Sequence, residues 1–283
     1  MDESMIRYIT VLFLGALFLG GCVGGGSYQS DKFRLAVTIA PTASLVEEIA
    51  GDRVEVITLL PQGNTPESYE PTPRDLAALA RASAYLYVGD LGFERSWLSR
   101  IGELYPELSL ISLRGACLHA ADEHHHDPHY WTGIRGIRQM SEQVYEALRG
   151  LDPVGDSVYR AGYLALQERI VALEQETRQR LSKAPSRAFV IFHPSLTDFA
   201  EEFGLRQLVI EQDGKEPTPM QLQTLIQTAR ELGVRTVFIQ KEFDEKLAKS
   251  VAEELGAKQV EINPLGADWG EQLRLITSAL SNE

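Results

Sequence analysis

Residues 156–183 read D-S-V-Y-R-A-G-Y-L-A-L-Q-E-R-I-V-A-L-E-Q-E-T-R-Q-R-L-S-K, and this stretch decides the fold. Its apolar residues recur at steps of three and four, which is the spacing of one face of a helix. At about 1.5 Å per residue, such a helix runs about 40 Å. The pattern predicts a single long, stiff helix, with a coiled-coil dimer as the alternative. The stripe consists of Tyr159, Tyr163, Leu166, Ile170, Leu173, Thr177 and Leu181.

Strands alternate with helices on both sides of this stretch. Before it, strands are predicted at 33–39, 54–60 and 84–88, and helices at 43–50 and 73–82. After it, strands are predicted at 188–192, 208–210, 236–239 and 259–262, and helices at 196–203, 219–232 and 245–255. This alternation is typical of a parallel sheet flanked by helices. We therefore expect an α/β fold with an N-terminal lobe at 33–152, a rigid linker helix at 153–183 and a C-terminal lobe at 184–283.

The N-terminus has the pattern of a bacterial signal peptide. The run from Tyr8 to Gly21 is apolar, is too short to remain as a membrane-spanning helix, and ends in Leu19-Gly-Gly-Cys22. A cysteine directly after small residues resembles a lipobox, whose thiol is acylated. We expect a signal peptide at 1–21, lipidation of Cys22, a flexible tether at 22–32 and a location outside the cytoplasm, anchored to a membrane. An uncut membrane anchor is the alternative.

Cysteine count and charge narrow the class of protein. The chain has two cysteines, so lipidation of Cys22 leaves only Cys117 and excludes an intramolecular disulfide. The formal net charge of −13 argues against nucleic acid as a partner and is favourable for binding cations. The sequence contains no Gly-rich phosphate loop, nucleophile elbow or His-Glu-x-x-His helix.

Histidine is concentrated at one place in the chain. Five of the six histidines lie in a loop at 117–129, and the sixth, His193, ends a predicted strand in F-V-I-F-H-P. Neutral imidazole is a common zinc ligand, and ligands in open α/β sheets bind at the carboxyl ends of strands. Glu67, His129, His193 and Asn263 all lie in loops of this kind, which predicts a metal ion in a cleft. A solvated loop that binds nothing specific is the alternative for the His-rich segment alone.

Several stretches together resemble the metal-binding lipoproteins of bacterial zinc and manganese ABC importers. They are Ser44-Leu-Val-Glu-Glu-Ile-Ala-Gly-Asp, Tyr69-Glu-Pro-Thr-Pro-Arg-Asp, Asp127-Pro-His-Tyr-Trp, Phe192-His-Pro-Ser-Leu and Gly214-Lys-Glu-Pro-Thr-Pro-Met-Gln-Leu. The resemblance covers essentially the whole mature sequence. It implies two α/β lobes joined by a rigid helix, with one metal ion between them that is delivered to a membrane permease. A cytoplasmic ATPase would drive the transport.

The resemblance also implies ligands. The family's second ligand falls on His129 and its third on His193, where manganese members usually have a carboxylate, so the ion is expected to be zinc, with manganese or iron as alternatives. Two positions depart from the family: Glu67 replaces the first histidine, and Asn263 replaces an aspartate. We expect Glu67 to be a ligand and Asn263 either to ligate or to orient Glu67. A decayed site, or one with a different cargo, is the alternative.

The sequence also contains candidate auxiliary metal ligands, and other functions compete with the transport role. His119, His124, His125 and His126 are candidate auxiliary ligands that would collect metal for the main site. We expect a monomeric binding protein and no enzyme. A secreted metal-dependent hydrolase is the competing class, with Asp198 as the candidate general base. A metal-buffering or adhesive surface lipoprotein would share the fold but lack a permease partner.

Overall fold

The computed structural model describes residues 33–114, 127–211, 214–241, 243 and 245–281. The predicted signal peptide and tether, both cysteines, and the candidate auxiliary ligands His119, His124, His125 and His126 lie outside the described residues. Among the described helices, none has the length and apolar character that crossing a membrane requires.

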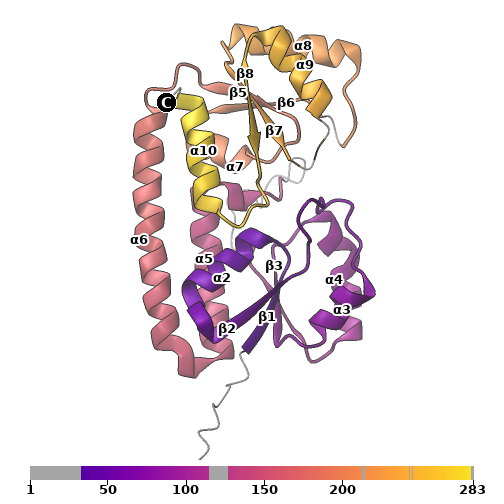
Figure 1. Ribbon diagram of the computed structural model, residues 1–283, viewed down its shortest axis with the longest axis vertical. Coiled ribbons are helices and arrows are strands. Elements are labelled where there is room, and N and C mark those ends of the chain that lie inside the picture. The colour runs from indigo at the N-terminus through magenta and orange to yellow at the C-terminus, as the bar shows by residue number, and fades with distance from the viewer. Residues whose placement is uncertain (1–32, 115–126, 212–213, 242, 244, 282–283) are drawn as a thin grey trace, which may run out of the picture. The chain divides into compact units, whose positions relative to one another are not determined.

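Two parallel four-stranded sheets form the framework of the described chain (Figure 1). The first sheet has the order β2-β1-β3-β4, and the second has the order β6-β5-β7-β8. In the first lobe the strands are β1 (Phe33–Val37), β2 (Val54–Thr58), β3 (Ala84–Tyr87) and β4 (Ser109–Ser112). In the second lobe they are β5 (Ala188–Ile191), β6 (Arg206–Val209), β7 (Thr236–Gln240) and β8 (Lys258–Ile262). The predicted α/β class with two parallel sheets is confirmed.

Helices cover both sheets. The first lobe contains α2 (Ala40–Ala50), the short 3-10 helix η1 (Gly51–Arg53), α3 (Pro73–Leu79) and α4 (Gly92–Leu104). Next come η2 (Tyr130–Thr132), α5 (Ile134–Leu151), η3 (Pro153–Gly155) and the long α6 (Asp156–Leu181). The second lobe contains α7 (Thr197–Glu202), α8 (Pro219–Glu231), α9 (Glu245–Leu255) and α10 (Trp269–Ser281).

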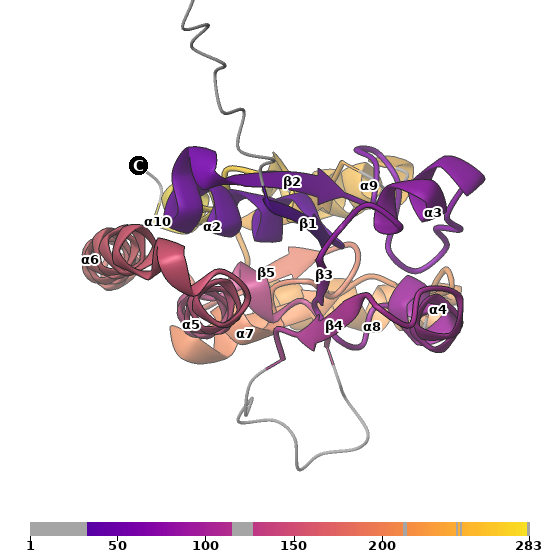
Figure 2. The same ribbon diagram turned by 90° about the horizontal axis from the view of Figure 1, so that it is seen from below.

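Helix α6 is the predicted long helix, and it packs against α2, α5 and α10 (Figures 1 and 2). Six of the seven stripe residues are buried and Tyr163 is partly buried, so the stripe lies in the chain's own core and is not free for a coiled-coil partner. Gly162 lies directly on α2, because a Cβ there would stand 2.4 Å from the carbonyl oxygen of Ile49. The weakest helix former in α6 is therefore required where two helices touch.

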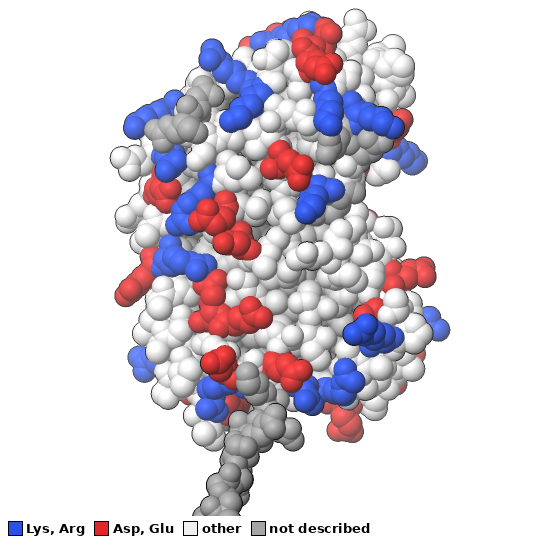
Figure 3. Space-filling model, in the orientation of Figure 1, with Lys and Arg blue, Asp and Glu red and all other residues white. Residues whose placement is uncertain are grey.

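Ion pairs join α6 to its neighbours at the surface, where acidic and basic side chains are interspersed (Figure 3). Arg169 pairs with Glu48 of α2 at 2.9 Å, and Arg274 of α10 pairs with Glu176 at 3.3 Å. Pairs as exposed as these contribute little stability individually. The fixed position of α6 comes from its buried stripe.

One hydrophobic core extends through both lobes. It includes Leu35 of β1, Ile170 of α6, Phe189 of β5 and Trp269 of α10 in one continuous cluster. A second, smaller core lies between the second sheet and helices α8 and α9. The two sheets are thus held by shared packing as well as by the long helix.

The structure differs from the sequence expectations at the ends of some elements and in several elements that were not predicted. Helix α2 begins at Ala40, three residues earlier than predicted, because Pro41 suits the first helical turn, where no N–H is needed. Strand β6 begins at Arg206, two residues before the predicted start. The sequence patterns also did not predict the strand β4, the helices α4, α5 and α10, or the three short 3-10 helices.

Candidate metal centre

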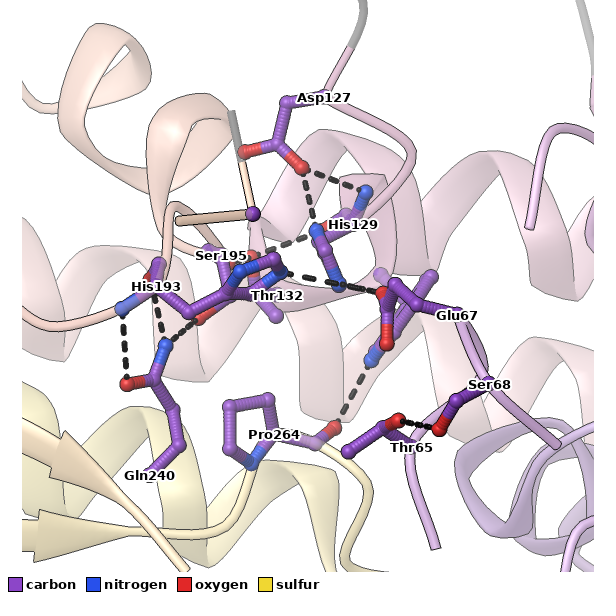
Figure 4. Close-up of polar contacts among 12 residues, drawn as sticks. Thr65, Glu67, Ser68, Asp127, His129, Thr132, His193, Ser195, Gln240 and Pro264 are labelled. Carbon is purple, nitrogen blue, oxygen red and sulfur yellow. Dashed lines mark hydrogen bonds and ion pairs between the residues drawn. The ribbon is translucent and has the colours of Figure 1, made fainter. Parts of the chain in front are cut away.

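Three predicted ligands reach one point from three separate segments (Figure 4). Glu67 lies in the loop between β2 and α3, His129 immediately precedes η2, and His193 follows β5 by two residues. In a parallel sheet the carboxyl ends of the strands share one edge, so loops after β2 and β5 project from corresponding edges of their sheets. Glu67 and His193, which were both predicted to lie in strand-end loops, therefore meet at this point.

The donor atoms of these three residues are close enough to share one ion. Oε1 of Glu67 lies 3.7 Å from Nε2 of His129 and 3.8 Å from Nε2 of His193. One donor from each residue can be chosen so that all three lie within 4.8 Å of one another. A zinc ion about 2.1 Å from each donor in tetrahedral geometry needs donors about 3.4 Å apart. The two distances from Glu67 exceed this separation by a few tenths of an ångström.

A carboxylate stands behind each imidazole. Nδ1 of His129 lies 2.5 Å from Oδ1 of Asp127, and Nδ1 of His193 lies 3.1 Å from Oε2 of Glu211. A carboxylate accepts the proton on Nδ1 and so leaves the Nε2 lone pair free. Nε2 of His193 is buried and makes no hydrogen bond within the described chain. Both rings are therefore oriented to offer an unprotonated nitrogen toward Glu67.

Charge at the site favours a cation. Burial by itself lowers the pKa of His129, but the charge and hydrogen bond of Asp127, followed by the charges of Glu67 and Asp198, raise that pKa above its usual value. Burial by itself raises the pKa of Asp127, but His129 holds it below its usual value. A proton and a divalent cation thus compete for the same imidazole.

The walls around the three donors are apolar and tight. The ring of Phe243 stacks on His193 with centroids 4.8 Å apart, and the ring of Trp131 lies 5.0 Å from that of His129. Gln240 accepts a hydrogen bond from the backbone N–H of His193 and donates one to its carbonyl oxygen. The cavity between these residues has a volume of about 20 Å³, which is the size for a single ion or water molecule.

The side chains of the three donors differ in their exposure. Those of His129 and His193 are 7% and 13% exposed, whereas that of Glu67 is 41% exposed. The nitrogen donors are thus inside and the oxygen donor faces solvent.

Asn263 lies next to this cavity but lines a different one. It directly follows β8, as predicted, and shares a cavity of about 40 Å³ with Lys241 and residues 60–64. Its amide oxygen is buried without a hydrogen-bond partner in the described part of the chain. The adjoining Pro264 does line the cavity of the three donors and accepts a hydrogen bond from Nε1 of Trp131 at 2.8 Å. The structure thus brings three of the four predicted residues to one cavity.

Two residues of the site were missed by sequence reasoning. Asp127 lies two positions before His129 within the stretch Asp127-Pro-His-Tyr-Trp, so a local signal for it was present. Glu211 comes 18 residues after His193, and its role depends on β6 lying beside β5. Asp198, the predicted general base, lies in the first turn of α7 and is not part of the cluster of metal-binding type found among the described residues.

The chain is similar to known metal-binding lipoproteins. The chain is 26% identical over 255 residues to the manganese-binding lipoprotein MntA of Halalkalibacterium halodurans, covering 87% of this chain and 84% of that protein. It is 25% identical over 273 residues to the zinc-binding lipoprotein AdcA of Streptococcus pneumoniae, covering 89% of this chain but 54% of AdcA.

Solved structures with the same fold include the crystal structure of ZnuA, with a TM-score of 0.84 and 35% identity over 89% of this chain and 99% of that chain. A mutant of the Mn-bound periplasmic metal-binding protein from Candidatus Liberibacter asiaticus has a TM-score of 0.78 at 22% identity, which shows the fold alone. The family model described as "Zinc-uptake complex component A periplasmic" matches residues 35–281. The chain therefore belongs to this family of periplasmic zinc-uptake components.

Proposed function

We propose that this chain is the extracytoplasmic metal-binding subunit of an ABC importer, and that Glu67, His129 and His193 hold one divalent transition-metal ion as cargo. The observation that carries the proposal is the orientation of the two imidazoles. Each has its Nδ1 facing a largely buried carboxylate and its Nε2 facing Glu67 at 3.7 or 3.8 Å. An ion would supply the partner that Nε2 of His193 lacks within the described chain, and it would be shared with Nε2 of His129 and Oε1 of Glu67.

Zinc is the cargo that the donor set fits best. Two nitrogen donors and one carboxylate oxygen suit zinc, whereas manganese prefers a site richer in oxygen. The same set of two histidines and one carboxylate also binds iron in other proteins, so iron and manganese are the alternatives. The Asn263 amide oxygen is the candidate for a fourth ligand, and local movement would have to bring it to the ion.

A binding role fits the cavity better than a hydrolytic one. A zinc hydrolase must place a substrate bond and a general base beside its ion, whereas the cavity here, of about 20 Å³, has the size for an ion or a water molecule. The charge of Asp198 raises the pKa of His129, but less than the charges of Asp127 and Glu67 do. A metal-dependent hydrolase is therefore the weaker candidate.

The proposed setting is a membrane surface. Residues 1–21 would be removed as a signal peptide, lipid on Cys22 would anchor the mature chain through the tether at 22–32, and a monomer would dock on a permease served by a cytoplasmic ATPase. The Cys22→Ser variant should then move to the soluble envelope fraction or remain unprocessed. Normal processing with unchanged anchoring would argue against lipidation.

The test of the central proposal is metal titration against a competing chelator. The wild type should bind one zinc ion tightly per chain, and His129→Ala and His193→Ala should each lose most of that affinity. Deletion of residues 119–126 should leave the tight ion in place and remove only weaker binding. Metal analysis of protein from its native envelope, before any chelator step, would identify the cargo. Tight binding that survives both histidine substitutions would show that the ion lies elsewhere.

A further inference from the structure

Glu94 is a completely buried carboxylate that is not part of the metal centre. It lies in the first turn of α4 and accepts the backbone N–H groups of Val88 at 2.8 Å and Gly89 at 2.6 Å. The hydroxyl of Thr38 also donates to it, and so does the backbone of Leu91. A buried charge persists only when hydrogen bonds satisfy it, so Glu94 holds the loop 88–91 in one conformation.

The loop that Glu94 holds is tied to one proposed ligand. The hydroxyl of Tyr130 is buried and donates to the carbonyl oxygen of Val88 at 2.6 Å. Tyr130 is the residue after His129 and the first residue of η2. The position of Val88 therefore limits where the backbone of His129 can lie.

The same turn is tied to a second proposed ligand. The N–H of Phe93 donates to the carbonyl oxygen of Pro66 at 2.8 Å. A Cβ on Gly92 would stand 3.0 Å from both Cα and the carbonyl oxygen of Glu67, so the two backbones are already in contact. The first turn of α4 thus supports the loop that carries Glu67.

We propose that Glu94 is a positioning residue of the metal centre: by holding loop 88–91 and the first turn of α4, its carboxylate fixes Glu67 and His129 relative to each other. This inference rests on the proposed function, since it concerns the affinity of the same site. Glu94 does not touch the ion. It acts through the backbone segments 88–91 and 66–67 and through Tyr130.

The hydrogen-bond donors around Glu94 suit its ionised form. Both of its oxygens accept hydrogen bonds from N–H or O–H groups. A protonated carboxyl or a glutamine amide would point a donor of its own at one of these donors. Burial raises the pKa of Glu94 to about 7. The hydroxyl of Thr38 faces Glu94, and the hydroxyl of Tyr85 is hydrogen-bonded to that of Thr38. Burial raises the pKa of Tyr85 well above its usual value. The loop it holds also carries Asp90, which pairs with Arg114.

The test compares Glu94→Gln with the wild type and with Glu103→Gln, which alters an exposed residue on the same helix. Zinc affinity is measured against a competing chelator across a pH range. Above pH 7 we expect Glu94→Gln to bind zinc about tenfold more weakly, as when a group supporting a ligand is lost, and Glu103→Gln to match the wild type. The affinity ratio between wild type and Glu94→Gln should fall toward one as the pH drops below about 7, because the wild type then carries a protonated Glu94.

This ratio separates a positioning role from a purely structural one, because the titration of the histidines is common to both proteins and cancels. A wild-type affinity in Glu94→Gln, or a ratio that does not change with pH, would overturn the proposal.

If Glu94→Gln fails to fold, Tyr130→Phe tests the same connection while keeping the carboxylate. This variant should lower the zinc affinity severalfold and alter the visible spectrum of bound Co²⁺. Unchanged affinity and spectrum in Tyr130→Phe would equally overturn it. Failure of the proposed function would instead appear as wild-type affinity in His129→Ala.

Discussion

The carboxylate of Glu211 lies 3.1 Å from Nδ1 of His193, and it also accepts the backbone N–H of Gly214 at 2.9 Å. One side chain at the end of β6 thus orients an imidazole that extends from the end of β5. The side chain of Glu211 is only 10% exposed, so water does little to screen its charge from the ring.

Glu211→Gln should weaken zinc binding by about tenfold, because a glutamine can still accept the Nδ1 proton but no longer makes the ring a stronger donor. Glu216→Gln is the matched control, since Glu216 is exposed in the segment that follows. Both affinities are measured by chelator competition at one pH. Equal affinity of Glu211→Gln and wild type would mean that His193 needs no carboxylate support.

Glu67→Ala should weaken zinc strongly, because it removes the only anionic donor of the proposed ligand set. Glu67→His should restore tight binding through three imidazoles, a set that zinc uses elsewhere. Both are compared by zinc titration with Glu70→Ala, an exposed carboxylate three residues away that should have no effect.

Asn263→Ala, measured in the same titration, should cost less than Glu67→Ala if the amide does not ligate. If Glu67→Ala binds zinc as tightly as the wild type, Glu67 is not a ligand.

Gly162→Ala should destabilise the fold by about 1–3 kcal/mol, since the new methyl group would push α6 away from the backbone of α2. The contact is with the carbonyl oxygens of Ile49 and Glu48. These are backbone atoms of a helix, so they cannot move away by a change of rotamer as a side chain can. Gly150→Ala is the control within α5, where the added Cβ meets nothing within 4 Å and should raise stability by up to about 1 kcal/mol. Chemical denaturation of the metal-free proteins gives both values. Similar effects at the two glycines would show that the contact at Gly162 adjusts freely.

The metal-free protein should become less stable as the pH rises from about 4.5 to about 7, relative to Glu94→Gln. Burial raises the pKa of Glu94 from 4.5 to about 7, so the folded chain binds more protons than the unfolded chain within that range. The difference in unfolding free energy between the two proteins should change by at most about 3 kcal/mol and stay constant above pH 7. Denaturant titrations at several pH values measure it, and a difference independent of pH would place the pKa of Glu94 near its ordinary value.

Much of the fold was predictable because hydrophobic periodicity is a local property. The stripe of α6 and the alternation of strands and helices could be read directly from the sequence. The pattern of α5 was also present, with buried Ile134, Ile137, Met140 and Val144 at helical spacing, but the prediction did not extend to it. Helix α4 buries Phe93, Ile101 and also the charged Glu94, so its apolar pattern is broken, and β4 is short and half exposed.

The site was predictable only in part, for a different reason. His193 and Asn263 could be placed at strand ends from the local pattern alone. The pairing of His193 with Glu211 depends on the order of strands in the second sheet, which periodicity does not reveal. The displacement of Asn263 into a neighbouring cavity depends on the path of the chain after β8, where Trp131 binds the carbonyl oxygen of Pro264.

The core shared by the two lobes has a consequence for the rate at which an ion can leave. Separating the sheets would expose buried side chains such as Phe189 and Trp269 to water, at about 25 cal/mol for each Å² of apolar surface. Residues 61–64, 67 and 68 are instead exposed in a short loop, and Glu67 is the one proposed ligand on it. We therefore expect the lifetime of the bound ion to depend on the motion of this loop, while both imidazoles keep their places in the core.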